Sequence, residues 1–100
     1  MTFHSTGHPA PLEGELTAVD VDGTKIAVAC VQGRLYAFQD ACTHMQCSLS
    51  SGDLEDTTVV CPCHLGRFDV TTGAVLEGPP PLPLRTWQAR VAQGRVEVAL

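Results

Sequence analysis

The sequence predicts an all-β domain made of short antiparallel strands, and three features lead to this prediction. β-branched and other apolar residues gather in short runs that are separated by the turn dipeptides Asp22-Gly23, Gln32-Gly33 and Gln93-Gly94. No stretch longer than a turn or two has the periodicity of an amphipathic helix. A proline-rich segment, 78–83, can form neither a helix nor a central strand.

Length and composition indicate one globular domain. The chain has 100 residues, of which 44% are hydrophobic and 17% charged. A formal net charge of −5 with few basic residues argues against nucleic acid as the main partner. No apolar run approaches the length of a membrane span, and residues 1–11 lack the hydrophobic segment of a signal peptide. We therefore expect a cytoplasmic monomer that does not associate with a membrane.

The first half of the chain predicts a three-stranded meander. Residues 1–11 show no periodicity and contain two prolines, so we expect a loose N-terminal arm. Strand-forming residues begin after Glu13 and continue to the Asp22-Gly23 turn. Two further strands follow, Lys25 to Val31 and Arg34 to Gln39.

The second half predicts further short strands around a polar loop. Ser48 to Asp56 is polar and rich in turn residues, and the β-branched run Thr57 to Cys61 follows it. A hairpin is expected to join Arg67–Val70 to Ala74–Leu76. The last two predicted strands are Leu84 to Val91 and Arg95 to Leu100, which are expected to pair with each other and can close the first sheet.

We expect one domain, 1–100, with an inserted subdomain. Segments 12–40 and 84–100 are expected to form a base of antiparallel strands that resembles a small sandwich or barrel. Segment 41–83 is inserted between them and includes the proline loop 78–83.

Two Cys/His pairs are the candidate functional residues. Cys42-Thr43-His44 is followed after sixteen residues by Cys61-Pro62-Cys63-His64. Thiolate and imidazole groups in this number are typical of a metal site. Cys30 lies within a predicted strand away from both pairs, and we expect it to be a buried, inert thiol.

Two metal centres compete for these four side chains. Zinc would take all four in a tetrahedral Cys2His2 structural site. A [2Fe–2S] cluster would take two cysteines on one iron and two histidines on the other. A zinc finger usually pairs Cys with Cys and places its histidines on a helix, whereas each pair here is mixed and no helix is predicted. Zinc remains the alternative to iron and sulfur.

The motif and its flanking residues resemble those of Rieske [2Fe–2S] proteins. Gly66-Arg67-Phe68-Asp69, Thr71-Thr72-Gly73 and Gly78-Pro79-Pro80 are similar to the segment that follows the second pair, including the proline loop that covers the cluster. The resemblance extends from about Leu12 to Val98. It implies a Rieske domain with an inserted cluster-binding subdomain, most like a stand-alone ferredoxin of bacterial oxygenase systems.

The resemblance also implies the ligands. Cys42 and Cys61 would bind the inner iron as thiolates, and His44 and His64 would bind the outer iron through one ring nitrogen each. Neutral imidazoles in place of two thiolates make a cluster less negative, so that it accepts an electron more readily.

Two more cysteines accompany the ligand motif. Cys47 lies three residues after His44, and Cys63 lies between Cys61 and His64. Cytochrome bc-type and arsenite-oxidase Rieske proteins carry a disulfide between cysteines in these places, whereas most oxygenase ferredoxins lack the pair. The resemblance implies a Cys47–Cys63 disulfide, with two free thiols in a reducing cytosol as the alternative.

Two other positions bear on the reduction potential. High-potential Rieske proteins have Ser and Tyr hydroxyls that donate to cluster sulfur atoms, and this chain has Gly66 and Phe68 where they align. Loss of these donors destabilises the reduced state, so the resemblance implies a potential towards the ferredoxin end of the Rieske range.

The chain is therefore expected to carry single electrons and to catalyse nothing by itself. The expected partners are a flavin-dependent reductase as donor and a terminal oxygenase, such as a dioxygenase, as acceptor. The alternatives are a small Rieske subunit of a larger oxidoreductase of the nitrite reductase or arsenite oxidase type, and a zinc-binding structural domain.

Overall fold

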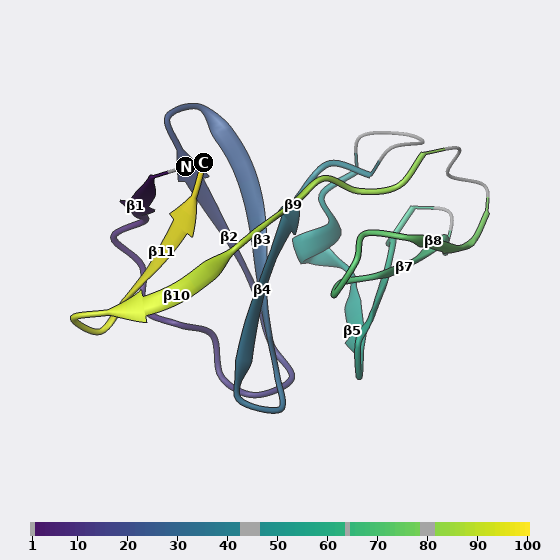
Figure 1. Cartoon of the computed structure of the whole chain (residues 1–100). Helices are drawn as coiled ribbons and strands as arrows, with labels where there is room; N and C mark the ends of the chain where they lie inside the picture. The colour runs from purple at the N-terminus through teal and green to yellow at the C-terminus, as the bar shows by residue number, and fades with distance from the viewer. Residues whose placement is uncertain (1, 43–46, 64, 79–81) are drawn as a thin grey trace.

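A computed structural model describes residues 2–42, 47–63, 65–78 and 82–100 (Figure 1). Strands β1 to β11 form three antiparallel sheets, and the described residues contain no α-helix. The described residues form one turn of 3-10 helix, η1 (Leu49–Ser51). The predicted all-β class is confirmed. No helix in this part of the chain is long and apolar enough to cross a membrane.

The first sheet of the base has the order β2-β3-β4-β9. Strands β2 (Leu16–Val21), β3 (Thr24–Val31) and β4 (Arg34–Gln39) form the predicted meander. Asp22 and Gly23 both have positive φ, 51° and 84°, which is the backbone that a tight hairpin turn requires. Strand β9 (Thr86–Trp87) completes this sheet by pairing with β4.

The second sheet of the base has the order β1-β11-β10 and lies beside the first (Figure 1). It contains β1 (Phe3–Ser5), β10 (Ala89–Ala92) and β11 (Arg95–Ala99). The predicted strand from Leu84 to Val91 is therefore divided at Gln88, with β9 in one sheet and β10 in the other. Side chains of both sheets form one apolar core, made of Val19, Val21, Ile26, Val28, Ala37, Val96 and Val98.

The prediction of a loose arm over residues 1–11 is wrong for its first part. Residues 3–5 form β1 and pair with the last strand of the chain, with Phe3 opposite Ala99 and His4 opposite Val98. The N–H groups of Thr2 and Leu100 each donate to the other's carbonyl, at 3.2 and 3.1 Å. A three-residue strand whose partner lies at the other end of the chain leaves no local pattern in the sequence.

The third sheet lies within the inserted segment and has the order β5-β6-β7-β8. Its strands are β5 (Asp53–Glu55), β6 (Thr58–Val60), β7 (Arg67–Asp69) and β8 (Val75–Glu77). The prediction that Ser48 to Asp56 is only a loop is wrong at β5. The sequence does not indicate this strand, because Leu54 alone faces the core between two exposed carboxylates.

A second apolar core joins the base to the insert. It contains residues from both parts: Ala27, Ala29, Phe38, Cys42, Leu49, Val59, Cys61, Phe68, Val70 and Leu84. The turn between β7 and β8 is fixed to the base at one point. The N–H of Leu84 donates to the carbonyl of Gly73 at 2.8 Å, and a Cβ at Gly73 would run into the Leu84 carbonyl oxygen.

Candidate metal centre

Cys42 and Cys61 each begin a loop that is closed in the same way. The Cys42 N–H donates to the Cys47 carbonyl at 2.8 Å, and the Cys61 N–H donates to the Gly66 carbonyl at 2.8 Å. Both hydrogen bonds join residues five apart. We call these segments, 42–47 and 61–66, the ligand loops. The structure thus places the two cysteines in equivalent positions.

Both cysteines are buried in an apolar environment. Cys42 and Cys61 are each 1% exposed and belong to the core that includes Leu49 and Phe68. Two buried thiols on adjacent loops, shielded from water, fit the cysteine half of a [2Fe–2S] site. His44 and His64 lie outside the described residues. Within the described segments, no three His, Cys, Asp or Glu side chains come together as a metal site.

A disulfide joins the ligand loops. Cys47 and Cys63 are bonded, and their α-carbons are 6.4 Å apart. This is the pairing that the resemblance implies. Cys47 is half-buried and Cys63 is exposed, so a reductant can reach the bond from solvent.

The first ligand loop is anchored by Asp40, which is 3% exposed. Its carboxylate accepts a hydrogen bond from the Ser50 N–H at 2.8 Å, and its carbonyl accepts one from the Leu49 N–H at 2.7 Å. These bonds hold both sides of the loop together just before Cys42. Sequence analysis did not identify Asp40, because an aspartate at the end of a strand is an ordinary turn residue.

Gln39 connects the same loop to the segment that follows the prolines. Its side-chain amide donates to the Ala41 carbonyl at 2.8 Å and accepts from the Arg85 N–H at 2.7 Å. The Gln39 N–H also donates to the Arg85 carbonyl at 2.9 Å. A single side chain therefore positions both the loop of Cys42 and the chain leaving the proline loop.

The second ligand loop packs against a glycine. A Cβ at Gly52 would collide with the Val60 carbonyl oxygen and would lie 3.1 Å from Cδ of Pro62. Only glycine lets the turn after η1 approach β6 and the start of the loop this closely.

Gly66 and Phe68 bring no hydroxyl to the site. Gly66 is buried and its carbonyl closes the second loop, while Phe68 is fully buried in the core with both cysteines. Their surroundings are apolar, as expected for a site without hydroxyl donors at these positions.

Cys30 lies apart from the ligand loops and is half-buried rather than buried as expected. Its Sγ lies 3.9 Å from Oε1 of Glu13. Burial, and then the negative charge of Glu13, raise the pKa of the Cys30 thiol. The N–H groups of Gln32 and Gly33 donate to the Glu13 carboxylate at 2.6 and 2.9 Å and lower its pKa.

Comparison with known proteins agrees with this site. The Rieske [2Fe-2S] domain family matches residues 4–88. The ferredoxin component of the naphthalene 1,2-dioxygenase system of Pseudomonas putida is 38% identical over 89 residues, which cover 89% of this chain and 86% of that protein. Sulredoxin of Sulfurisphaera tokodaii is 44% identical over 89 residues, covering 81% and 82%.

Solved structures give the same result. The ferredoxin of carbazole 1,9a-dioxygenase from Nocardioides aromaticivorans superimposes with a TM-score of 0.82 at 33% identity, covering 99% of this chain and 95% of that one. A complex of reduced oxygenase and oxidised ferredoxin in carbazole 1,9a-dioxygenase also matches with a TM-score of 0.82 at 33% identity, covering 99% and 91%.

Proposed function

We propose, from the premise that the chain belongs to the Rieske [2Fe–2S] family, that it is a one-electron carrier which passes electrons to an oxygenase. The cofactor of this family is a Rieske-type [2Fe–2S] cluster, which removes the zinc alternative. The chain is an electron-transfer component and not itself an enzyme. Relatives that match along most of their length include ferredoxin components of dioxygenase systems.

The proposed ligands are Cys42 and Cys61 on one iron and His44 and His64 on the other. The equivalent hydrogen bonds at the start of both ligand loops, and the burial of both thiols, support the cysteine half of this assignment. The bound cluster supplies one reversibly transferred electron. The apolar core excludes water from the thiolates, while the loops hold them in place.

Two exposed leucines, Leu65 and Leu82, offer apolar surface for contact with a protein partner. Leu65 follows His64, is 68% exposed and has a φ of 59°, a left-handed backbone that is unfavourable for leucine. Leu82, at the end of the proline segment, is 61% exposed. Exposed apolar side chains of this kind are expected to be covered when donor or acceptor docks.

The proposed donor is a flavin-dependent reductase and the proposed acceptor is a terminal oxygenase. The complex of ferredoxin with oxygenase in carbazole 1,9a-dioxygenase supports the acceptor. The proposal places a monomeric carrier in the cytoplasm together with both partners. It assigns 12–40 and 84–100 to the base and 41–83 to the cluster-binding subdomain.

A second candidate is a small Rieske subunit of a larger oxidoreductase. The Cys47–Cys63 disulfide favours it, because such disulfides are typical of Rieske proteins outside the oxygenase ferredoxins. A subunit of this kind would co-purify with a large subunit at a fixed ratio, whereas a carrier would be isolated alone.

Reduction by a flavoprotein tests the proposed role. Purified, cluster-loaded protein is mixed anaerobically with NADH and a catalytic amount of the flavin-dependent reductase of a naphthalene dioxygenase system. We expect the visible absorbance to bleach with the uptake of one electron per chain. The Cys42→Ser variant, which removes a proposed ligand, serves as the control and should take up none. Absence of bleaching with a reductase that reduces its own ferredoxin would contradict the proposal.

A further inference from the structure

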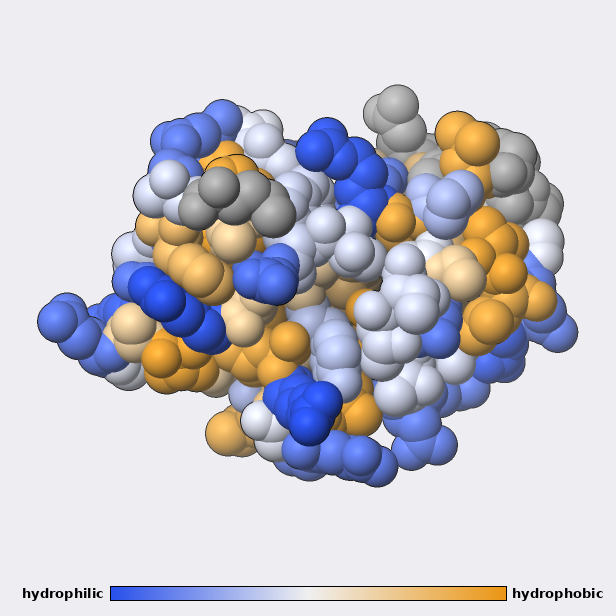
Figure 2. Space-filling view, viewed as in Figure 1, coloured by the Kyte–Doolittle hydropathy of each residue, from blue (hydrophilic) through white to orange (hydrophobic). Residues whose placement is uncertain are grey.

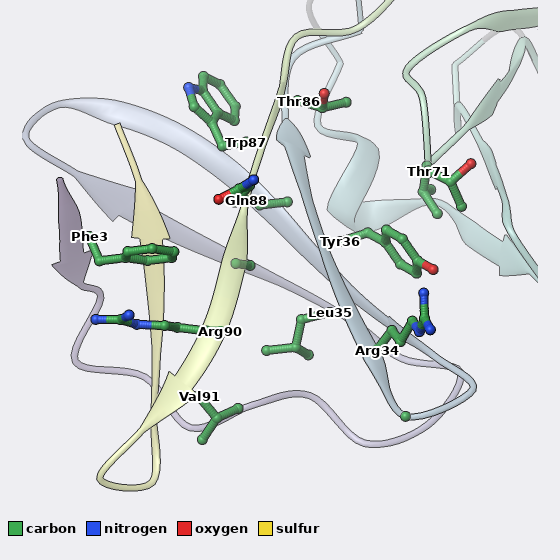
Figure 3. Close-up of a pocket in the computed structure, with 14 residues that line it drawn as sticks. Phe3, Arg34, Leu35, Tyr36, Thr71, Thr86, Trp87, Gln88, Arg90 and Val91 are labelled. Atoms are coloured by element: carbon green, nitrogen blue, oxygen red, sulfur yellow. The ribbon is translucent and has the colours of Figure 1, made fainter. Parts of the chain in front are cut away.

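A groove crosses the base beside β4 and β10, away from the ligand loops. Strand β4 pairs with β3 along its whole length but with β9 only through Ala37 and Phe38. The chain then enters the other sheet, where β10 pairs with β11. The strands diverge below Gln88 and leave a groove of about 710 Å³ between them (Figure 3). Figure 2 shows this face of the molecule with its side chains.

The strands that border the groove each have an unpaired edge. Among the described residues, segment 34–36 of β4 pairs with β3 alone, and β10 pairs with β11 alone. Exposed edges of this kind can accept an extended segment of another chain through main-chain hydrogen bonds. Leu35 and Val91 form an apolar floor between them (Figure 3).

Three partly buried aromatic residues are among those that line the groove. The chain has five aromatic residues, and Phe38 and Phe68 are fully buried. The other three, Phe3, Tyr36 and Trp87, are half-buried and line the groove. Aromatic side chains that are partly exposed on one surface are typical of protein docking sites.

The charge of the groove is opposite to that of the molecule. The chain carries eleven acidic residues and a net charge of −5, yet no carboxylate lines the groove. Arg34 and Arg90 line it, and the Arg85 guanidinium lies 5.2 Å from the centre of the Trp87 ring at its margin. Arg90 also stacks on Phe3 at 3.9 Å.

The carboxylates that border the groove already have partners. Glu97 bonds Arg90 at 2.8 Å, Glu13 accepts from the Gly33 N–H at 2.9 Å, and Asp69 accepts from Thr71. They reduce the positive potential at their own positions, but Arg34 has no ion pair among the described residues. The groove therefore presents Arg34 and Arg90 on opposite sides of its apolar floor.

We propose that this groove is a docking site for an extended acidic segment of a partner protein. The segment places an apolar side chain over Leu35 and Val91, and carboxylates on either side of it face Arg34 and Arg90. The site contains no residue of 42–47, 61–66 or 78–83, so a bound segment leaves the proposed electron-transfer surface uncovered. This inference goes beyond the carrier function and does not rest on it.

The test uses the cluster-loaded protein and the blocked peptide acetyl-Glu-Val-Glu-Leu-Glu-Val-amide, with the same peptide carrying Gln for Glu as control. Trp87 is the only tryptophan, so its fluorescence reports binding, and amide shifts in two-dimensional NMR locate it. We expect saturable binding that weakens as salt is added. The amide signals of residues 34–37 and 86–91 should shift on binding. The Gln peptide should bind about tenfold more weakly.

Matched variants separate this site from general charge attraction. Arg34→Glu and Arg90→Glu should each weaken binding about tenfold, whereas Lys25→Glu makes the same charge change on β3, outside the groove, and should leave the affinity unchanged. The proposal is overturned if no saturable binding occurs, if the shifts lie elsewhere, or if Lys25→Glu weakens binding equally. It is also overturned if sedimentation shows a dimer of the free protein that Arg34→Glu dissociates, because a second copy then occupies the groove.

Discussion

Cys47 and Cys63 link the two ligand loops through a disulfide, each of them lying in the same loop as one buried ligand cysteine. The carbonyl of Cys47 also receives the hydrogen bond that closes the first loop at Cys42. The crosslink therefore limits how far Cys42 and Cys61 can separate when the chain unfolds locally.

Removal of this disulfide should destabilise the protein. The bond closes a loop with a sequence separation of 16. A loop of this size contributes about 3 kcal/mol to the free energy of unfolding in the chain-entropy estimate. We expect Cys47→Ser with Cys63→Ser to lower the melting temperature by circular dichroism and to hasten loss of visible absorbance. Cys30→Ser is the control. A double variant as stable as the parent would contradict the structural role of the bond.

Hydroxyl groups introduced near the ligands should raise the reduction potential. Phe68→Tyr and Gly66→Ser each offer a donor that stabilises the more negative reduced state. One hydrogen bond of about 1.4 kcal/mol corresponds to about 60 mV for a one-electron couple. A redox titration followed by EPR measures the change. Phe68→Leu, which adds no donor, should not raise the potential. If Phe68→Tyr and Gly66→Ser also leave it unchanged, the account of the low potential is wrong.

Substitution by alanine should destabilise the protein more at Gly73 than at Gly94, although the two glycines have similar backbone conformations. Gly73 has a φ of 83° and touches the Leu84 carbonyl, whereas Gly94 has a φ of 76° with open space around it. Gly94→Ala should cost about 1 kcal/mol from its backbone alone, and Gly73→Ala should cost about 1–3 kcal/mol more through displacement of Leu84. Urea denaturation measures both. Equal losses would show that the contact with Leu84 is not rigid.

Glu13 should make the free energy of unfolding depend on pH. Its carboxylate accepts hydrogen bonds from two N–H groups of the β3–β4 turn, which lower its pKa from the usual glutamate value in the folded protein. A lowered folded-state pKa stabilises the fold above the unfolded pKa, and this contribution disappears as the pH falls through the folded value. Glu13→Gln should therefore lower the melting temperature at neutral pH but not in strong acid. An equal difference at both pH values would contradict this assignment.

The strands of the base were predictable where the pattern is local. Residues 16–39 alternate between turn dipeptides and strand-forming runs, and the structure has β2, β3 and β4 there. β1 was not predictable because Phe3 pairs with Ala99, at the far end of the chain. β5 was missed because two of its three residues are exposed acids.

The candidate site was predictable in its residue types but not in its support. The spacing of the Cys/His pairs identified the ligand loops, since metal chemistry limits which side chains can serve. The hydrogen bonds of Gln39 and Asp40 that hold these loops were not predictable, because amides and carboxylates at strand ends are common in any β domain.

EPR of the purified, metal-replete protein tests the central claim most directly. The protein is examined as isolated, after ascorbate and after dithionite. We predict a rhombic iron–sulfur signal that appears only with dithionite, with an average g value below that of an all-cysteine cluster because of mixed His/Cys ligation. A signal already present with ascorbate would contradict the low potential inferred from Gly66 and Phe68. No rhombic signal after dithionite would contradict the Rieske centre itself.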